Sequence, residues 1–128
     1  MRKVITTENA PKAIGPYSAA IETETFVFTS GQLGLDPNTG ELVSGGIEAE
    51  THQAIKNLYE VLKASGSDIN LVVKTTVFLK DINEFSLMNN IYGLYFKNEP
   101  PARSAFQVAA LPKNASVEIE AVAIKISR

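Results

Sequence analysis

The amino-acid sequence predicts an α+β fold in which two helices cover one mixed sheet. Two segments, residues 47–64 and 83–96, carry apolar residues at helical spacing. The segments around them are short and rich in Val, Ile, Thr and Phe, which favours strands. The chain has 128 residues and no Gly/Ser- or Pro-rich linker divides it, so we expect residues 1–128 to form a single domain.

The first half of the chain is expected to contain strands followed by a helix. In order, we expect strand partners at Ile5 and residues 19–21, a strand at 26–30, a turn at 36–40 with a return at 41–43, and a helix at 47–64. The turn is indicated by the sequence Asp-Pro-Asn-Thr-Gly, whose residues favour tight reversals. Gly45-Gly46 interrupts the chain before the helix, and Gly66 ends it.

The second half is expected to contain one strand, one helix and a final hairpin. We expect a strand at 71–79, a helix capped by Asn83 and ended by Pro100-Pro101, and strands at 106–111 and 117–126. The helix should bury a face made of Phe85, Met88, Tyr92, Tyr95 and Phe96. The last two strands should pair antiparallel around Pro112-Lys113-Asn114, since that cluster can turn the chain.

The composition narrows the classes of function. Twelve basic and fourteen acidic side chains are scattered, so no basic stripe favours nucleic-acid binding. Cysteine is absent, which excludes disulfides, a thiolate nucleophile and a Cys-ligated zinc site. The first residues lack the long apolar core of a secretory signal, and no apolar run approaches the ~18 residues of a membrane span. A cytoplasmic location and no membrane association are therefore expected.

One arginine and two glutamates suggest a site for a small acid. Arg103 follows Pro100-Pro101, which fix an extended approach, and a guanidinium matches a carboxylate through paired donors. Glu118 and Glu120 lie two residues apart in a strand-like run, and therefore on one face. On spacing alone, however, a strand-end arginine paired with a surface glutamate is the favoured interpretation, and the site for a small acid is the alternative.

Other residues have weaker functional signals. Gly31-Gln32-Leu33-Gly34 matches an RNA-binding Gly-x-x-Gly loop but lacks flanking basic residues, although Gly31 would let a ligand approach the backbone. His52, the only histidine, has no second ligand type nearby in sequence, so we expect a rim position and no metal site. Tyr17 follows the turn Gly15-Pro16 and either packs against a neighbour or points its hydroxyl at a ligand. Asn89 shares the apolar face of the second helix, where a structural hydrogen bond is the favoured role.

Taken together, several motifs in this order resemble the RidA family, also called the YjgF or reactive intermediate deaminase family. The matching segments are Ala13-Ile14-Gly15-Pro16-Tyr17-Ser18, Thr29-Ser30-Gly31-Gln32, residues 36–41, residues 73–78, Asn89-Asn90-Ile91-Tyr92, Pro101-Ala102-Arg103-Ser104 and Val117-Glu118-Ile119-Glu120-Ala121. The resemblance implies a chorismate-mutase-like fold whose sheets pack around the axis of a homotrimer, with ligand clefts between subunits. It also implies hydrolysis of 2-iminobutanoate and 2-iminopropanoate, released by pyridoxal-dependent dehydratases, to 2-oxo acids and ammonia.

The resemblance also implies roles for individual residues. Arg103 would clamp the carboxylate of a small 2-imino or 2-oxo acid, and Glu118 would handle the water. Tyr17, Ser30, Gly31 and Asn89 would complete the substrate site; the chemistry needs no metal or organic cofactor. Many members carry a cysteine two residues after the arginine, where this chain has Ala105, so any thiol chemistry at that position is absent here.

Two other functions on the same fold stay open from the sequence. One is a non-catalytic regulator that binds 2-oxo acids, from which only the role of Glu118 separates a deaminase. The other is an endoribonuclease or translation inhibitor, which the acidic balance and single histidine argue against.

We also expect the site to lie between subunits. In the expected final hairpin, Arg103 would stand opposite Ile124 and Glu118 opposite Ala109, so the two groups would lie roughly 20 Å apart within one chain. A neighbouring chain would then have to bring its Glu118 to this chain's Arg103.

Overall fold

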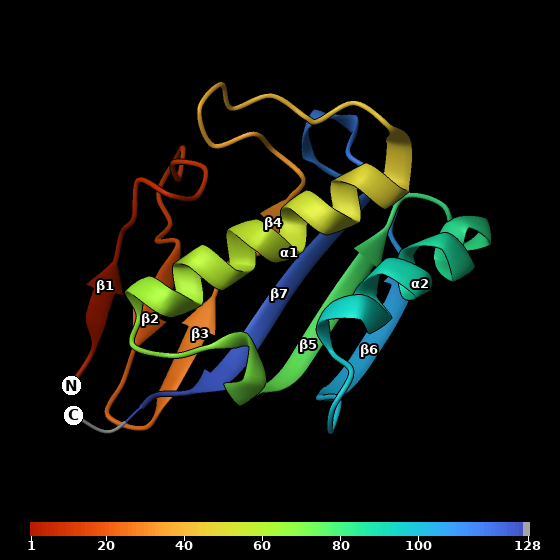
Figure 1. Cartoon of the computed structure of the whole chain (residues 1–128). Helices are drawn as coiled ribbons and strands as arrows, with labels where there is room; N and C mark the ends of the chain where they lie inside the picture. Colours follow the sequence, from red (N-terminus) through yellow and green to blue (C-terminus); the bar gives the residue numbers. More distant parts are fainter. Residues whose placement is uncertain (127–128) are drawn as a thin grey trace.

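The computed structural model describes residues 1–126, which form one mixed seven-stranded sheet with two helices on a single face (Figure 1). The strands are β1 (Lys3–Ile5), β2 (Ala20–Glu22), β3 (Phe26–Thr29), β4 (Gln32–Leu33), β5 (Val72–Leu79), β6 (Ala102–Gln107) and β7 (Val117–Ile124). The helices are α1 (Gly46–Ala64) and α2 (Phe85–Tyr95). Along the sheet the order is β1-β2-β3-β7-β5-β6. Strand β4 also pairs with β7, at Glu118 and Ile119, on the same edge where β3 pairs with residues 122–124. The predicted fold class is confirmed.

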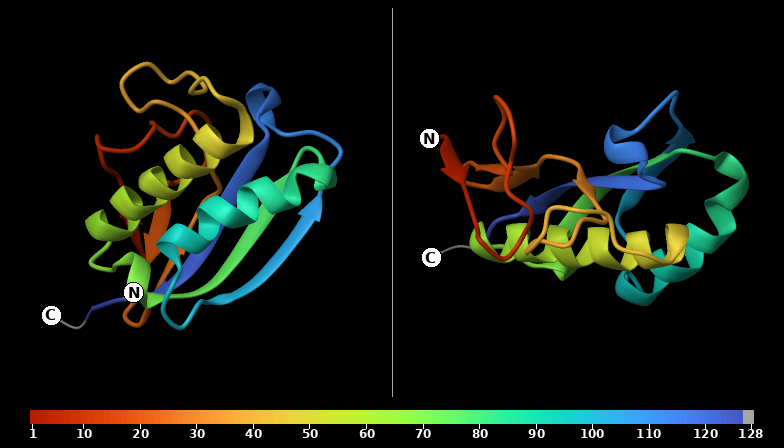
Figure 2. Two further views of the ribbon diagram at one scale, coloured as in Figure 1. Left: turned by 45° about the vertical axis from the view of Figure 1, so that its right-hand side comes forward. Right: turned by 90° about the horizontal axis from the view of Figure 1, so that it is seen from above.

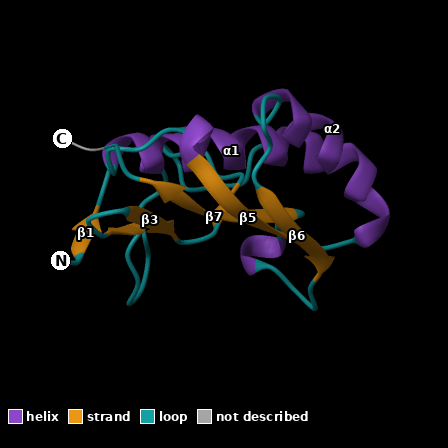
Figure 3. Ribbon diagram, turned by 90° about the horizontal axis from the view of Figure 1, so that it is seen from below, coloured by secondary structure: helices purple, strands orange, loops and turns teal. Residues whose placement is uncertain are grey.

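Both helices pack on the same side of the sheet, and the opposite side carries the short 3-10 turn Pro112–Asn114 and part of the N-terminal loop (Figures 2 and 3). The core lies between the helices and the sheet, where α1 buries Ile55, Leu58 and Leu62 completely. Alternate residues of β7 complete it, including Val117 and Ile119. Since neighbouring strand residues point to opposite faces, Glu118 and Glu120 lie on the face without helices. We call this surface the open face.

The expected final hairpin is wrong. Strand β6 pairs in parallel with β5 and lies at the edge of the sheet, while β7 pairs antiparallel with both β3 and β5. Helix α2 joins β5 to β6, as parallel neighbours require a crossover. The longer β7 buries alternate side chains and fills the central position, whereas every residue of β6 is at least partly exposed. Residues 108–116 therefore carry the chain past β5 instead of turning it back onto β6.

Helix boundaries follow the sequence closely, with one exception. Helix α1 begins one residue before the expected start and ends at Ala64, where Gly66 takes a positive φ of 72°. Asn83 does not cap α2. Instead, Asp81 accepts a hydrogen bond from the Asn83 amide and starts a 3-10 turn at Ile82–Glu84, from which α2 continues at Phe85. An Asp two residues upstream thus took the capping role because its side chain reaches the first free amides.

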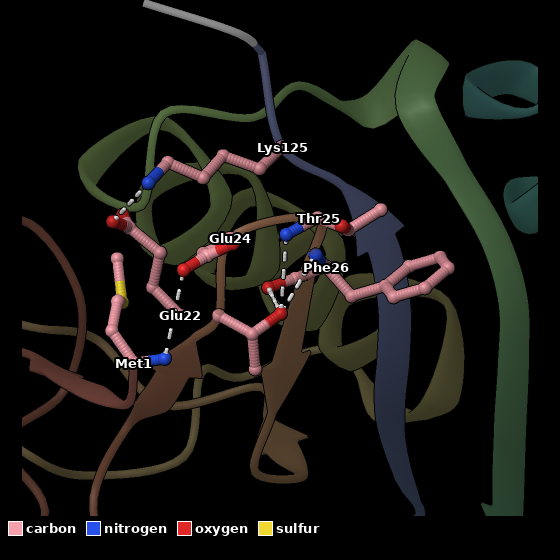
Figure 4. A network of polar contacts seen from close by, with 7 residues as sticks. Met1, Glu22, Glu24, Thr25, Phe26 and Lys125 are labelled. Carbon is pink, nitrogen blue, oxygen red and sulfur yellow. Dashed lines mark hydrogen bonds and ion pairs between the residues drawn. The ribbon is translucent and has the colours of Figure 1, made fainter.

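A buried ion pair links Lys125, the residue just after β7, to Glu22 at the end of β2. Lys125 Nζ lies 2.7 Å from Glu22 Oε2, and both side chains are largely buried (Figure 4). The Met1 amino group lies 3.9 Å from Glu24 in the same region. Breaking a buried pair leaves an uncompensated charge, so this contact holds the end of β7 against β2. It lies at the end of β7 opposite to Glu118 and has a structural role.

Among residues 1–126, no helix is long and apolar enough to cross a membrane.

Candidate functional site

Glu118 lies in a cleft on the open face. Its side chain is half-buried and borders a cavity of about 330 Å³ together with Tyr17 and Gly31. The rest of the wall is mainly apolar and comes from residues 11–14, Ala19, residues 32–33, Leu35 and Pro112; it also includes two lysines, Lys12 and Lys113. Strand β7 positions the carboxylate by pairing Glu118 with Leu33 of β4 and Phe78 of β5. A carboxylate in a partly dry cleft can accept a proton from water bound beside it.

The absence of a side chain at Gly31 leaves room for the Glu118 carboxyl group. A Cβ at this position would lie 2.6 Å from Glu118 Cδ and 2.8 Å from Oε2, distances that real atoms do not adopt. The backbone of Gly31 has no positive φ, so the close approach and not the turn geometry requires glycine here. The sequence predicted that a ligand would approach the backbone at this residue, whereas the group that lies against it in the structure is the Glu118 side chain.

Ser30 and Tyr17 lie next to this cleft. Ser30 Oγ donates to the Ser18 carbonyl at 2.6 Å, and its amide donates to Ala19 at 2.9 Å, which fastens the N-terminal loop to the end of β3. Ser30 borders an adjoining hollow and does not line the Glu118 cleft. Tyr17 borders both and is 53% exposed, so its phenol can reach a ligand in either.

The environment of Glu118 raises the pKa of its carboxyl group. Burial raises the pKa of this carboxyl group above the ordinary value of 4.5, and the nearby charge of Glu120 raises it further. Lys113 Nζ is close to the cleft but donates to the Gly40 carbonyl at 3.0 Å. A raised pKa makes the ionised carboxylate a stronger base, which is typical of catalytic acids and bases.

We expect Gly31→Ala to reduce any activity that depends on Glu118 while leaving the fold intact. The new methyl group meets the flexible end of a side chain, so the carboxylate moves and the backbone does not. A displacement of this size costs about 10- to 100-fold in turnover. Turnover and thermal unfolding of the variant check this.

Gly34→Ala is the contrasting control. Its Cβ would lie 2.6 Å from the Cα and the carbonyl oxygen of Glu50, which belong to the backbone of α1 and cannot rotate away. This variant should lose stability. A Gly31→Ala protein with normal turnover would show that the position of the Glu118 carboxylate does not matter.

Arg103 lies at the other edge of the sheet, on the face that carries the helices. It is the second residue of β6 and pairs with Thr75 of β5. Its Nη1 donates to Asn89 Oδ1 at 2.8 Å. Its guanidinium carbon lies 4.8 Å from the ring centre of Tyr92 and 5.3 Å from that of Phe85. Beside it is a hollow of about 380 Å³ bordered by Tyr92, Gly93, Phe96 and Pro100-Pro101.

Arg103 and Glu118 do not meet within one chain. Arg103 pairs with Thr75, which on its other side pairs with Ala121 of β7. Glu118 lies three residues before Ala121 on β7, and β7 is two strands away from β6. The Cα atoms of Arg103 and Glu118 are therefore about 14 Å apart. Their side chains also leave opposite faces of the sheet, since Arg103 contacts α2 and Glu118 points away from both helices. The sequence-based distance depended on a hairpin that does not exist, but the conclusion that one chain cannot join them stands.

The remaining sequence candidates have structural contacts. His52 is half-buried, and its Nδ1 lies 2.8 Å from the Tyr95 hydroxyl, which links α1 to α2. Within the glycine-containing loop, Gln32 and Leu33 form β4, and Gly34 packs on α1, so this segment is not an open loop that could clasp RNA. Asn89 is exposed and does not lie in the core, but it bonds to Arg103.

Sequence reasoning missed Phe85 and Tyr92 as partners of Arg103. Their spacing from Asn89, four residues before and three after, places all three on one face of α2, and that pattern was visible in the sequence. The missing information was the parallel pairing of β5 with β6, which places the Arg103 side chain against this face of α2.

Fold and geometry together define a small α+β protein with a cationic hollow at Arg103 and an acidic cleft at Glu118, which we call the two half-sites. Residues 7–125 match the family model described as Endoribonuclease L-PSP, and the chain belongs to this family, the YjgF/RidA family. It is 57% identical over 125 residues to the human protein named 2-iminobutanoate/2-iminopropanoate deaminase, covering 98% of this chain and 91% of the relative. The mouse protein of the same name is 56% identical, covering 98% and 93%.

The solved structures agree with this assignment. Escherichia coli TdcF, solved with bound serine, superposes with a TM-score of 0.91 at 37% identity, covering 97% of this chain and 99% of TdcF. The predicted family is confirmed.

Proposed function

We propose that this protein is a 2-iminobutanoate/2-iminopropanoate deaminase, which hydrolyses reactive imines to 2-oxo acids and ammonia. The proposal is supported by the names of the human and mouse relatives and by a pair of half-sites with the required chemistry. Arg103 holds the substrate carboxylate, and Glu118 activates water. Tyr17, Gly31 and Asn89 border or support these two groups, with Ser30 anchoring the loop that carries Tyr17.

The reaction needs positioning more than strong chemistry. The protonated imine carbon is already electrophilic, so a water molecule held beside it can attack once a base accepts its proton. Glu118 takes that proton as the carbon–oxygen bond forms. The nitrogen of the resulting carbinolamine then receives the proton, the carbon–nitrogen bond breaks, and Glu118 accepts the hydroxyl proton as the carbonyl forms. Glu118 then passes this last proton to the departing ammonia, which leaves as ammonium, and is again a carboxylate. The products are the 2-oxo acid and ammonium, and the proposed steps use no metal or organic cofactor.

The single observation that carries this proposal is Glu118, a carboxylate with a raised pKa packed against Gly31 in an apolar cleft. The test generates the imine with a pyridoxal-dependent dehydratase acting on threonine or serine and follows decay of the imine with and without this protein. Faster decay than the spontaneous rate supports the proposal. A protein that binds 2-oxobutanoate but does not accelerate decay is instead a regulator.

Because the family is described as Endoribonuclease L-PSP, the same preparation should also be tested for RNA cleavage. The site does not favour that activity. The only histidine lies beside Tyr95 between the two helices, away from the Glu118 cleft, and the net charge is −2. RNA-binding surfaces usually carry excess positive charge.

We further propose that the protein assembles as a homotrimer through its open face. This face exposes large apolar side chains that a lone chain would leave in water: Phe26 (38%), Phe28 (46%), Phe106 (46%) and Ile124 (41%). They flank the strip that holds Glu118 and Glu120 on β7. A sheet covered by helices on one side only, with apolar groups on the other, favours a partner there.

Sedimentation at micromolar concentration should therefore show a trimer and no stable monomer. Phe28→Asp should dissociate it, because a charge would enter the proposed interface. The same variant should lose activity. A wild-type monomer that remains fully active would contradict the proposed assembly.

The third part of the proposal places the site between subunits, with Arg103 of one chain and Glu118 of its neighbour. Refolding a mixture of inactive Arg103→Ala and Glu118→Gln chains should restore activity, because some interfaces receive both intact residues. With random mixing, about one quarter of the interfaces are intact, which sets the upper limit for recovery. Each variant refolded alone is the control. Mixed trimers without activity would contradict a site shared between Arg103 of one chain and Glu118 of its neighbour.

A cytoplasmic location remains a prediction from the sequence.

A further inference from the structure

We propose that Phe85 and Tyr92 are positioning residues that fix the plane of the Arg103 guanidinium before substrate binds. This inference rests on the proposed function, since it concerns how the carboxylate clamp works. A free arginine side chain rotates about several bonds and loses conformational freedom when it clamps a ligand. A clamp that is already held still loses less, and binds more tightly for the same hydrogen bonds.

Three residues of helix α2 contact the guanidinium. Phe85, Asn89 and Tyr92 share one face of α2 because they are spaced by four and three residues. Their contacts with Arg103 are of two kinds. The rings lie 5.3 and 4.8 Å from the guanidinium carbon, within cation–π distance, and Asn89 accepts one hydrogen bond at 2.8 Å. The rings leave all N–H groups free, and Asn89 occupies a single one of five, so paired donors remain for a carboxylate.

A closed circuit of contacts holds Tyr92 in place. The backbone of Arg103 pairs with Thr75, and Thr75 Oγ1 lies 2.7 Å from the Tyr92 hydroxyl. The Tyr92 ring then returns to the Arg103 side chain. Thr75 is completely buried and Tyr92 nearly so, which means that neither has room to swing away.

The state of the Tyr92 phenol suits this role. Burial raises its pKa above 10.0, against the smaller lowering effects of Thr75 and Arg103, so the phenol stays protonated. It presents a neutral ring and makes no ion pair with Arg103. A phenolate would compete with the substrate carboxylate for the guanidinium.

The test combines Phe85→Leu, which keeps apolar volume but removes the ring, with Arg103→Ala in a double-mutant cycle. In the wild-type background, Phe85→Leu should weaken 2-oxobutanoate binding by about fivefold and raise KM similarly, with kcat changed less. In the Arg103→Ala background it should have no further effect on binding. Tyr92→Phe keeps the ring and should restrict the loss to about twofold. Leu87→Ala, on an exposed part of the same helix, is the control for general disturbance of α2.

The outcomes separate this inference from the proposed function. Equal losses from Phe85→Leu in both backgrounds, or no loss in either, would overturn the positioning role. A protein that binds 2-oxobutanoate in a Phe85-dependent way but does not hydrolyse imines would support the positioning role and overturn the deaminase. A wild-type protein that neither binds 2-oxobutanoate nor hydrolyses imines would overturn both.

Discussion

Replacement of Arg103 by alanine should abolish nearly all imine hydrolysis while the protein stays folded. A bidentate, charge-assisted contact contributes ~2–4 kcal/mol to transition-state binding, so kcat/KM should fall about 30- to 1000-fold. Arg103 is on an edge strand and only half-buried, and its contacts are with Asn89 and two aromatic rings. The free energy of unfolding should therefore change little compared with the loss of activity.

Arg103→Lys is the matched variant for this experiment. It keeps the positive charge but loses the planar pair of donors, so its activity should lie between wild type and alanine. Steady-state kinetics with a short imino acid and thermal unfolding of each variant provide the measurements. Near-normal hydrolysis by the alanine variant would show that Arg103 does not clamp the substrate.

Replacement of Glu118 by glutamine should reduce turnover far more than ligand binding. Glutamine keeps the shape of the side chain beside Gly31 but cannot accept the proton of the attacking water. General base catalysis contributes about 10²- to 10⁴-fold, which is the expected fall in kcat. Binding of 2-oxobutanoate should persist, since the neighbouring chain's Arg103 is intact in the proposed site. Comparison of kcat with the dissociation constant separates the two effects.

Glu120→Gln is the paired control. Glu120 shares the face of Glu118 but pairs with Thr76 and does not border the cleft, so its loss should change kcat little. A loss of activity confined to this variant would transfer the catalytic role to Glu120. Its one expected effect concerns pH. The charge of Glu120 helps to raise the pKa of Glu118, so the acid limb of the activity profile should move to lower pH when that charge is removed.

The sign of the pKa shift also predicts an effect on stability. The pKa of Glu118 is higher in the folded chain than its ordinary value of 4.5, so the folded state binds the proton more tightly than the unfolded state. This tighter proton binding stabilises the folded state at pH values below the pKa that Glu118 has in the unfolded chain. The stabilisation is lost as the pH rises through the higher pKa that Glu118 has in the folded chain. At neutral pH the ionised carboxylate therefore destabilises the fold, and Glu118→Gln should unfold at a somewhat higher temperature than wild type.

Much of the fold could be predicted from local patterns, but strand order could not. The periodicity of α1 and the glycine after it gave that helix within one residue, because both act over a few neighbouring positions. The error came at residues 108–116, a connection that can either reverse a chain or carry it across a strand. Which of these happens depends on whether β6 or β7 takes the central position in the sheet. That choice is set by contacts between residues far apart in sequence.

The site shows the same limit. Arg103 and Glu118 could be selected from their residue types and from the family resemblance, and neither of these requires knowledge of the fold. That they leave opposite faces of the sheet could not be read from the sequence, since it depends on β6 being parallel to β5. Phe85 and Tyr92 were already assigned to one helical face, but their relation to Arg103 depends on the same pairing.

The position of β7 has a consequence for how the chain folds during its synthesis. Among residues 1–126 this strand comes after all the others, yet it pairs with β3 and β5 and separates them. Until residues 117–124 have left the ribosome, the hydrogen-bonding edges of β3 and β5 have no partner between them. The native sheet can therefore close only after translation of the whole strand, and a nascent chain that stalls earlier presents two open strand edges to which other chains can pair.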